Sequence, residues 1–272
     1  MKVLIIAAVA ATAIAGYVGL PRVLDAMGLR KKNFRGDLVP AAYGAQVIFF
    51  ALLGIIVAGA FKLCPTRVCL LYAAAIGAMA ALGLLDDRFG GRDTGGFAGH
   101  FKKLLLERKI TTGAVKALGG GVVALALVAA IPNQKAQWPL NAVLIALSAN
   151  ALNLIDLRPG RAFAGFMFGL PLVAAACGFR LQGAWPIAAL ALPAAAMAWP
   201  DMRGRAMMGD TGSNALGAVL GLTLALDCGV IIKALAVVFL AALHIFCEKY
   251  SLTAIIERSP ALKKLDALLG VR

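Results

Sequence analysis

Residues 68–88, VCLLYAAAIGAMAALGLLDDR, contain a long uncharged run that ends in two aspartates. An α-helix needs about 20 apolar residues to cross the hydrocarbon core of a bilayer. The run 68–85 therefore predicts a transmembrane helix that ends at Asp86 and Asp87. The whole chain of 272 residues has the same character, because 61% of its residues are hydrophobic, only 15% are charged and the mean hydropathy is +0.87. Soluble domains are about half apolar and a quarter charged, so a soluble fold is excluded.

Further apolar runs cover most of the remaining sequence. They lie at 3–20, 41–61, 114–132, 139–155, 162–179, 184–200, 213–227 and 230–247. We therefore predict an all-α, polytopic membrane helix bundle of about nine transmembrane helices, with residues 1–250 as one transmembrane domain. The first run has no small-residue cleavage site, so we interpret it as a helix and not as a signal peptide.

The C-terminal segment 251–272 has a different pattern. Leucines and isoleucines recur at helical spacing between charged residues, and Pro260 is expected to divide the segment into two short helices. This pattern predicts an amphipathic cytoplasmic tail that lies on the membrane surface.

The basic residues predict the orientation. Loops 21–40, 86–113, 156–161 and 201–212, together with Lys116 and all residues after Cys247, hold 21 of the 27 lysines and arginines. Basic loops face the cytoplasm, so we expect the N-terminus outside, the C-terminus inside and a multi-pass protein of the cytoplasmic (inner) membrane. The net charge of +14 then reflects contact with anionic lipid and anionic substrates. No nucleic-acid-binding module is recognised, so nucleic acid is not expected as a partner.

Four aspartates are predicted at the same cytoplasmic face. Asp86 and Asp87 end the third run, Asp156 ends the fifth, and Asp210 precedes the eighth. An ionised group near the hydrocarbon costs about 2.5–3.5 kcal/mol, so the group needs a partner. Mg²⁺, or Mn²⁺, bound with a phosphorylated ligand would supply one. The alternative is that each aspartate is a solvated helix end or caps a neighbouring helix.

Histidine and cysteine suggest no metal site. The five cysteines lack paired metal-ligand spacing, and we interpret them as packing residues of the membrane helices. His244 lies within the ninth run and is expected to be buried and hydrogen-bonded. For His100 a proton donor, a phosphate contact and a loop-packing residue all remain open.

Basic residues near the aspartates could bind phosphate. The loop 86–113 carries Arg88, Arg92, His100, Lys102, Lys103, Arg108 and Lys109. Most of this charge is typical of a cytoplasmic loop, and we expect one or two of these residues to hold a diphosphate. Thr211-Gly212-Ser213 opens the eighth run, where free helix amides favour an anion. Ser213 is equally suited to an N-cap.

Three motifs together carry a family resemblance. The pair Asp86-Asp87, the stretch Asn150–Asp156 (NALNLID) and the stretch Gly209–Gly217 (GDTGSNALG) occur in this order along the chain. They resemble the polyprenyl-phosphate N-acetylhexosamine-1-phosphate transferase superfamily, or glycosyltransferase family 4. This family includes phospho-N-acetylmuramoyl-pentapeptide transferase and the GlcNAc-1-phosphate transferases. The resemblance covers about residues 1–250.

The resemblance implies an enzyme and its partners. It implies Mg²⁺-dependent transfer of a sugar 1-phosphate, such as an N-acetylhexosamine 1-phosphate, from a UDP-sugar to polyprenyl phosphate. UMP is released, and the product enters a cell-envelope glycan pathway at its first membrane step. Members of the family often dimerise, so a homodimer is expected as well.

The resemblance also assigns residues. By the family pattern the catalytic positions are Asp86, Asp87, Asn153 and Asp156. Asp210 falls on the main metal-binding aspartate, with Asp87 as a second metal ligand. Lys102 or Lys103 corresponds to a lysine that contacts phosphate.

The sequence also departs from the family pattern. Gly90 stands where a basic residue is common, and Asp156-Leu157-Arg158-Pro159-Gly160 lacks the usual second acid. Members of the family have a histidine-rich loop after the ninth helix and a tenth helix, and this sequence shows neither. Arg88, Arg158 and Arg161 are candidates to hold phosphates, and Arg158 or Arg161 could supply the charge lost at Gly90.

These departures leave a second hypothesis, a catalytically degenerate membrane scaffold or lipid-binding homologue. A transporter or channel is disfavoured, because the acidic residues lie at one face and almost none lie in mid-span.

Overall fold

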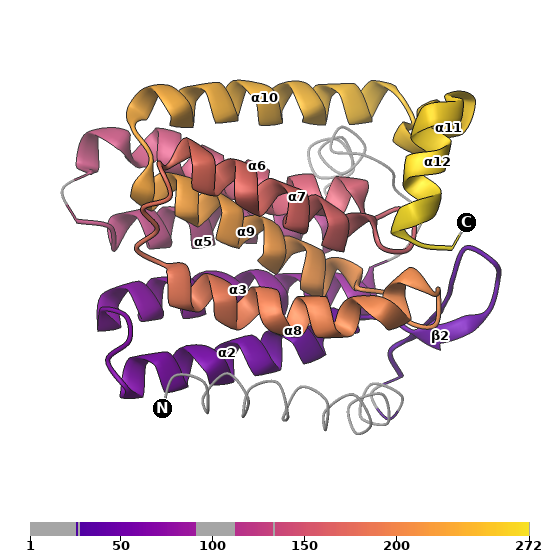
Figure 1. The fold of residues 1–272 in the computed structure, drawn as a ribbon, viewed down its shortest axis with the longest axis horizontal. Coiled ribbons are helices and arrows are strands. Elements are labelled where there is room, and N and C mark those ends of the chain that lie inside the picture. Colours follow the sequence, from indigo (N-terminus) through magenta and orange to yellow (C-terminus); the bar gives the residue numbers. More distant parts are fainter. Residues whose placement is uncertain (1–25, 27, 91–111, 133, 272) are drawn as a thin grey trace.

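The computed structural model describes residues 26, 28–90, 112–132 and 134–271 (Figure 1). This part of the chain is mainly helical, with one short antiparallel hairpin of β1 (Arg30–Lys32) and β2 (Leu38–Pro40). Lys31 pairs with Val39 in this hairpin, which the sequence did not predict. The long helices are α2 (Gly44–Ala60), α3 (Thr66–Phe89), α5 (Thr112–Ala129), α6 (Trp138–Ile155), α7 (Arg161–Ala176), α8 (Ala184–Met202), α9 (Gly209–Asp227) and α10 (Val230–Lys249). A 3₁₀ turn, η1 (Lys135–Gln137), precedes α6.

Helix α9 lies at the centre of the bundle. It packs mainly against α6 and α3, and every residue from 211 to 225 is buried. Glycines permit the close approach to α6. A Cβ on Gly217 would lie 2.8 Å from the Ala149 Cα, and one on Gly221 would lie 2.9 Å from the Ile145 Cα. This contact agrees with the use of small residues at membrane helix interfaces.

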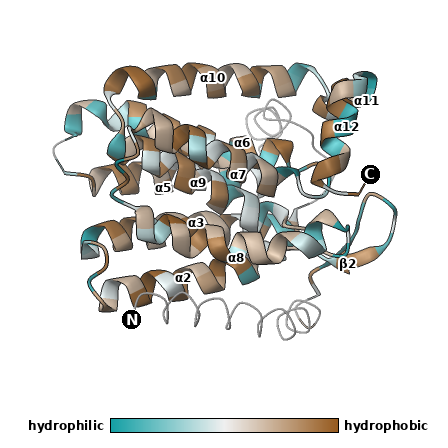
Figure 2. Ribbon diagram, in the orientation of Figure 1, coloured by the Kyte–Doolittle hydropathy of each residue, from teal (hydrophilic) through white to brown (hydrophobic). Residues whose placement is uncertain are grey.

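Helix α10 is the outermost of the long helices. Only Lys233 is buried on it, and its surface is apolar over most of its length (Figure 2). Leu235, Val238 and Phe239 are between 65% and 68% exposed. An exposed apolar face of this size is unusual for a soluble protein and suits contact with lipid.

Four helical segments of the described chain are long and apolar enough to cross a membrane. They are α3, α5, the segment Lys135–Ile155 formed by η1 and α6, and α10. The eight predicted runs from 41–61 to 230–247 all form helices, so the helical class is confirmed. The run 3–20 lies outside the described residues. Nine crossings and their orientation remain predictions.

The tail forms two short helices, α11 (Leu252–Arg258) and α12 (Pro260–Leu269). Ser251 and Ser259 cap them by accepting hydrogen bonds from backbone amides. Both helices lie across one end of the bundle, the end that also carries the β-hairpin (Figure 1). The division at Pro260 was predicted.

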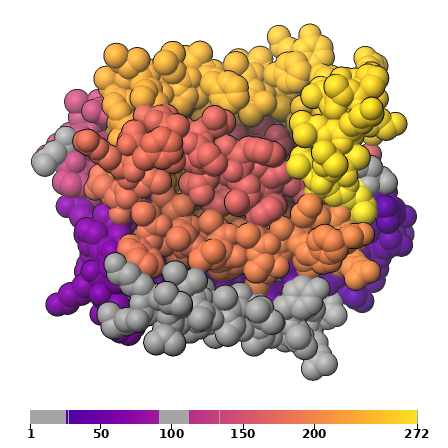
Figure 3. Space-filling model, viewed as in Figure 1, coloured from indigo at the N-terminus to yellow at the C-terminus, as the bar shows by residue number. Residues whose placement is uncertain are grey.

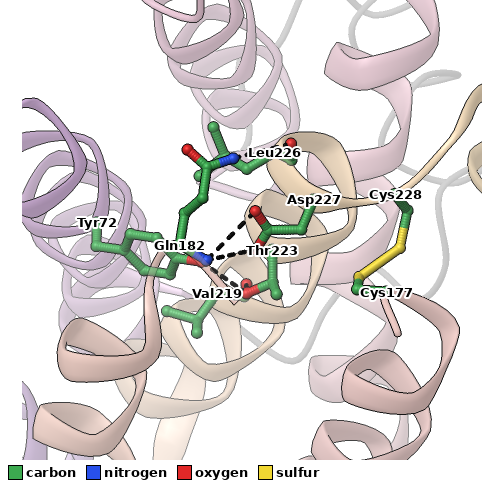
Figure 4. Close-up of a disulfide and its surroundings, with 8 residues drawn as sticks. All are labelled: Tyr72, Cys177, Gln182, Val219, Thr223, Leu226, Asp227 and Cys228. Carbon is green, nitrogen blue, oxygen red and sulfur yellow. Dashed lines mark hydrogen bonds between the residues drawn. A yellow bond between two sulfur atoms is a disulfide. The ribbon is translucent and has the colours of Figure 1, made fainter. Parts of the chain in front are cut away.

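The interpretation of the cysteines was wrong for two of them. Cys177 at the end of α7 and Cys228 at the end of α9 form a disulfide (Figure 4). Cys64, Cys69 and Cys247 are free thiols. Two apolar helix ends that meet in space give no pairing signal in the sequence, which is why the disulfide was missed.

Polar contacts accompany the disulfide at this end of α9. Both Asp227 carboxylate oxygens accept hydrogen bonds from the Gln182 backbone amide, at 3.3 and 3.4 Å. The Tyr72 and Thr223 hydroxyls are 2.9 Å apart (Figure 4). Asp210 lies in the first turn of α9 and Asp227 at its last residue, so the two ends of this helix carry different polar clusters.

Candidate functional site

Four helices bring a polar cluster together at the N-terminal end of α9. Lys116 from α5 donates a hydrogen bond to Asp210 Oδ2, and its Nζ lies 3.7 Å from Asp86 Oδ2 at the end of α3. Asn153, from the last turn of α6, faces the same groups. With its amide oriented to satisfy both neighbours, Asn153 donates to Asp210 Oδ1 at 2.9 Å and accepts from Lys116 Nζ at 2.6 Å. We call Asp86, Lys116, Asn153 and Asp210 the carboxylate–lysine cluster.

Asp87 is buried beside this cluster and caps α9. Its Oδ1 accepts from the Asp210 backbone amide at 3.1 Å. Its Oδ2 accepts from the Thr211 backbone amide at 2.9 Å and from the Thr211 hydroxyl at 2.6 Å. The free amides of a helix N-terminus attract anions, and here the anion is a side chain of α3. The contacts of Asp87 therefore match the alternative interpretation of the aspartates, in which an aspartate caps a neighbouring helix.

Two glycines allow α3 and α9 to approach at this point. A Cβ on Gly83 would overlap the backbone carbonyl of Asp210. Gly209 has a φ of +70°, and a Cβ there would lie 2.6 Å from Asp87 Oδ2. Any larger residue would separate Asp86 and Asp87 from Asp210, so the geometry of the site depends on both glycines.

Asp156 and Asp201 form a second acidic pair nearby. Asp201, at the end of α8, is 3% exposed. It accepts from the backbone amides of Gly160 at 2.7 Å and Met208 at 3.0 Å, which ties two loops together. Burial, followed by the charges of Asp201, Asp210 and Asp87, raises the pKa of Asp156 well above the ordinary carboxyl value.

The predicted phosphate-binding arginines have different surroundings. Arg88 is exposed, and its guanidinium stacks 5.6 Å from the centre of the Phe89 ring. Arg158 stacks over Phe34 at 5.3 Å and lies 3.5 Å from Glu257. Both keep part of their donor capacity toward solvent.

Arg161 requires a correction. Its side chain is 5% exposed and forms a bidentate ion pair with Asp266 of α12, with hydrogen bonds of 2.7 and 2.9 Å. Its remaining donor bonds the Thr253 hydroxyl at 3.0 Å. Arg161 therefore holds the tail against α7 and is not placed to bind substrate phosphate. The sequence gave no signal for this pair, because its members are 105 positions apart.

Other predicted residues are placed as follows. Ser213 is buried; its hydroxyl donates to the Gly209 carbonyl at 3.1 Å and lies 3.4 Å from the Asn153 amide. His244 bonds the Leu240 carbonyl through Nδ1 at 2.7 Å. The predictions for His100, Lys102 and Lys103 fall outside the described residues.

Lys116 is the residue of the cluster that the sequence reasoning missed. Its sequence position predicts only that it is one of the basic residues that set the orientation. A lysine near the start of an apolar helix is typical of a positive-inside loop, so its sequence position alone could not distinguish the two roles.

The carboxylates of the cluster are the donor type that Mg²⁺ prefers. In the described residues no three His, Cys, Asp or Glu side chains are arranged to share one metal ion. However, Mg²⁺ usually takes one or two carboxylates and completes its shell with water and substrate phosphates. Asp86 and Asp210 direct one oxygen each at a single ammonium group, so two carboxylates already converge on one cation.

The comparisons with known proteins add no family assignment. No family model matches the chain, and a search of curated proteins finds no significant match. The function is therefore inferred from the motifs and from the geometry of the cluster.

Proposed function

We propose that this protein transfers a sugar 1-phosphate from a UDP-sugar to polyprenyl phosphate, with release of UMP. The carboxylate–lysine cluster is the observation that carries the proposal. Asp86, Asn153 and Asp210 come from separate sequence motifs and meet around one lysine at the same end of the bundle. If these three residues served only to cap helices, their side chains would not need to meet around one lysine.

The reaction needs charge stabilisation more than proton transfer. An oxygen of the lipid phosphate attacks the phosphorus atom that carries the sugar, and the bond from that phosphorus to UMP breaks. The second pKa of a phosphate monoester is about 6, so the nucleophile is largely ionised at neutral pH and needs no strong base. Lys116 would stabilise the negative charge that develops on the departing phosphate.

The acidic residues would orient these groups. Asp86 and Asp210 would hold Mg²⁺, which would supply positive charge to neutralise the diphosphate of the donor. Asn153 bonds both Asp210 and Lys116, so it fixes their separation. Asp87 acts indirectly, because it positions Asp210 through the backbone at the start of α9.

The disulfide supports the proposed orientation. Disulfides persist in oxidising compartments such as the periplasm and are rare in the cytosol. Cys177 and Cys228 lie at the end of the bundle opposite Asp210. An external disulfide would leave the carboxylate–lysine cluster at the cytoplasmic face, where UDP-sugars are found.

A second function is a non-catalytic membrane scaffold or lipid-binding homologue. Two contacts favour it: Asp87 is engaged by the amides of α9, and Arg161 is engaged by Asp266. Neither residue then contacts a substrate directly.

The test is release of UMP from a panel of UDP-sugars by detergent-purified protein with polyprenyl phosphate and Mg²⁺. Asp210→Asn removes one carboxylate from the cluster. Asp227→Asn makes the same change at the opposite end of the same helix and is the matched control. We expect metal-dependent release with one donor, loss of at least a hundredfold in Asp210→Asn and a normal rate in Asp227→Asn. No release from any donor by folded protein would reject the transferase and favour the scaffold.

A further inference from the structure

An open groove of about 390 Å³ lies at the end of α8, and no residue of the carboxylate–lysine cluster lines it. It is lined by Arg35, Trp199, Met202, Arg203, Ala267, Leu268, Gly270 and Val271. The lining is apolar except for two arginines, and it contains no acidic residue. Such a combination of apolar wall and guanidinium groups suits an amphipathic anion.

The three walls of the groove are tied together by hydrogen bonds. The Asn33 side chain of the β-hairpin donates to the Gly204 carbonyl after α8 at 2.9 Å, and it also accepts from the Arg35 amide at 2.8 Å. The Val271 amide of the tail donates to the Met202 carbonyl of α8 at 2.7 Å. The Arg161–Asp266 pair also ties α12 to α7. The groove is therefore a fixed part of the fold and not a gap beside a loose tail.

The two arginines keep their donors available. Arg203 stacks on the Trp199 ring at 4.2 Å, and Arg35 stacks on Phe34 at 5.1 Å. Both side chains are exposed, and no carboxylate of the described residues forms an ion pair with either. Stacking orients a guanidinium without consuming its hydrogen-bond donors.

The position of the groove matches a membrane interface. Helix α12 lies across the end of the bundle, so it would run parallel to a bilayer that the long helices cross (Figure 1). In space-filling view it lies against the chain segments of α7 and α8 (Figure 3). Leu262, Leu265 and Leu268 share its exposed face, with Leu268 76% exposed. Trp199 is 55% exposed, as expected for an aromatic residue at the headgroup level.

We propose that this groove binds an anionic phospholipid of the surrounding bilayer. Arg35 and Arg203 would bind its headgroup phosphate, and one acyl chain would lie along Trp199 and Leu268. Charge complementarity selects an anionic headgroup, and the apolar wall selects a ligand with a chain. The site would hold the tail and the β-hairpin at the membrane surface.

The experiment is native mass spectrometry of the full chain in detergent, titrated with phosphatidylglycerol or with phosphatidylcholine of the same chains. The double variant Arg35→Gln/Arg203→Gln removes both groove charges. Lys263→Gln/Lys264→Gln removes two exposed charges of α12 outside the groove and is the matched control. We expect the groove variant to bind phosphatidylglycerol about 25-fold more weakly, because each basic residue near an anionic lipid contributes a factor of about five. We expect little change in the control.

Four results would overturn the proposal. Equal weakening in both double variants would mean that binding follows overall charge. Competition by inorganic phosphate alone, or preference for polyprenyl phosphate over phosphatidylglycerol, would give the groove to another ligand. A lower melting temperature of the groove variant would mean that its weaker binding could reflect unfolding. The test then rests on the wild-type protein, and equal binding of phosphatidylglycerol and phosphatidylcholine by the wild type would reject the site.

Discussion

Asp266→Asn should release the C-terminal tail from the bundle without unfolding the transmembrane helices. The Arg161 and Asp266 side chains are only 5% and 9% exposed, and the pair forms two charge-assisted hydrogen bonds. Asparagine removes the negative charge and one of the two acceptor oxygens, so the buried guanidinium keeps only neutral acceptors there, the amide oxygen and the Thr253 hydroxyl. Breaking a buried ion pair from one side costs about 3–5 kcal/mol.

The free-energy cost of breaking this pair should weaken the docking of the tail and leave the stability of the core unchanged. The tail contacts the body mainly through α7 and the end of α8, so docking of α11 and α12 is expected to open independently of the core. A cost of about 3 kcal/mol shifts the docking equilibrium by about a hundredfold, since 1.4 kcal/mol corresponds to a factor of ten.

Hydrogen–deuterium exchange of peptides covering residues 252–269 measures this opening. We expect exchange about a hundredfold faster in Asp266→Asn, with α9 peptides unchanged. Glu257→Gln is the matched control, because the Arg158–Glu257 pair is exposed and surface pairs contribute about 0–1 kcal/mol. Arg161→Leu with Asp266→Leu should restore most of the protection, because it leaves no unpaired buried charge. Equal exchange in Asp266→Asn and Glu257→Gln would refute the reasoning.

Three further predictions concern the two ends of α9. Lys116→Met should lower the rate of UMP release at least tenfold, because the cluster loses its only ammonium, and a normal rate would contradict the assignment of Lys116. Asp87→Ala should lower the free energy of unfolding by about 2 kcal/mol, measured by thermal unfolding, since it removes the cap of α9; Asp87→Asn should lose less. Cys177→Ser with Cys228→Ser should cost about 4 kcal/mol, the value expected for a closed loop of 51 residues. Reductant should lower the melting temperature of the wild type but not of this variant.

The helical architecture could be predicted because apolar runs are local signals. The predicted runs 41–61 and 139–155 differ from α2 and α6 by three residues or fewer at each end. The division of the tail at Pro260 was equally local, because proline removes a backbone donor. No comparable signal marked the β-hairpin, which is held by Asn33 through contacts within its turn and with Gly204.

The candidate site was predictable only in part. The motifs placed Asp86, Asn153 and Asp210 at one face, and the structure brings them together. The roles of Lys116 and Arg161 depend on partners far along the chain, so residue type and local spacing could not reveal them. Asp87 was predicted from the same motif as Asp86, but the direction of its side chain toward α9 depends on how the two helices pack.

The buried Arg161–Asp266 pair also has a consequence for the order of synthesis. Asp266 leaves the ribosome 105 residues after Arg161. At about 5–20 residues per second, the guanidinium waits about 5–20 s for its carboxylate while α7 is already made. During that interval Arg161 lacks its carboxylate partner, so hydration of the guanidinium at the start of α7 avoids the cost of an unpaired buried charge. Docking of α12 would therefore follow the synthesis of α7 by this interval and would complete the burial of Arg161.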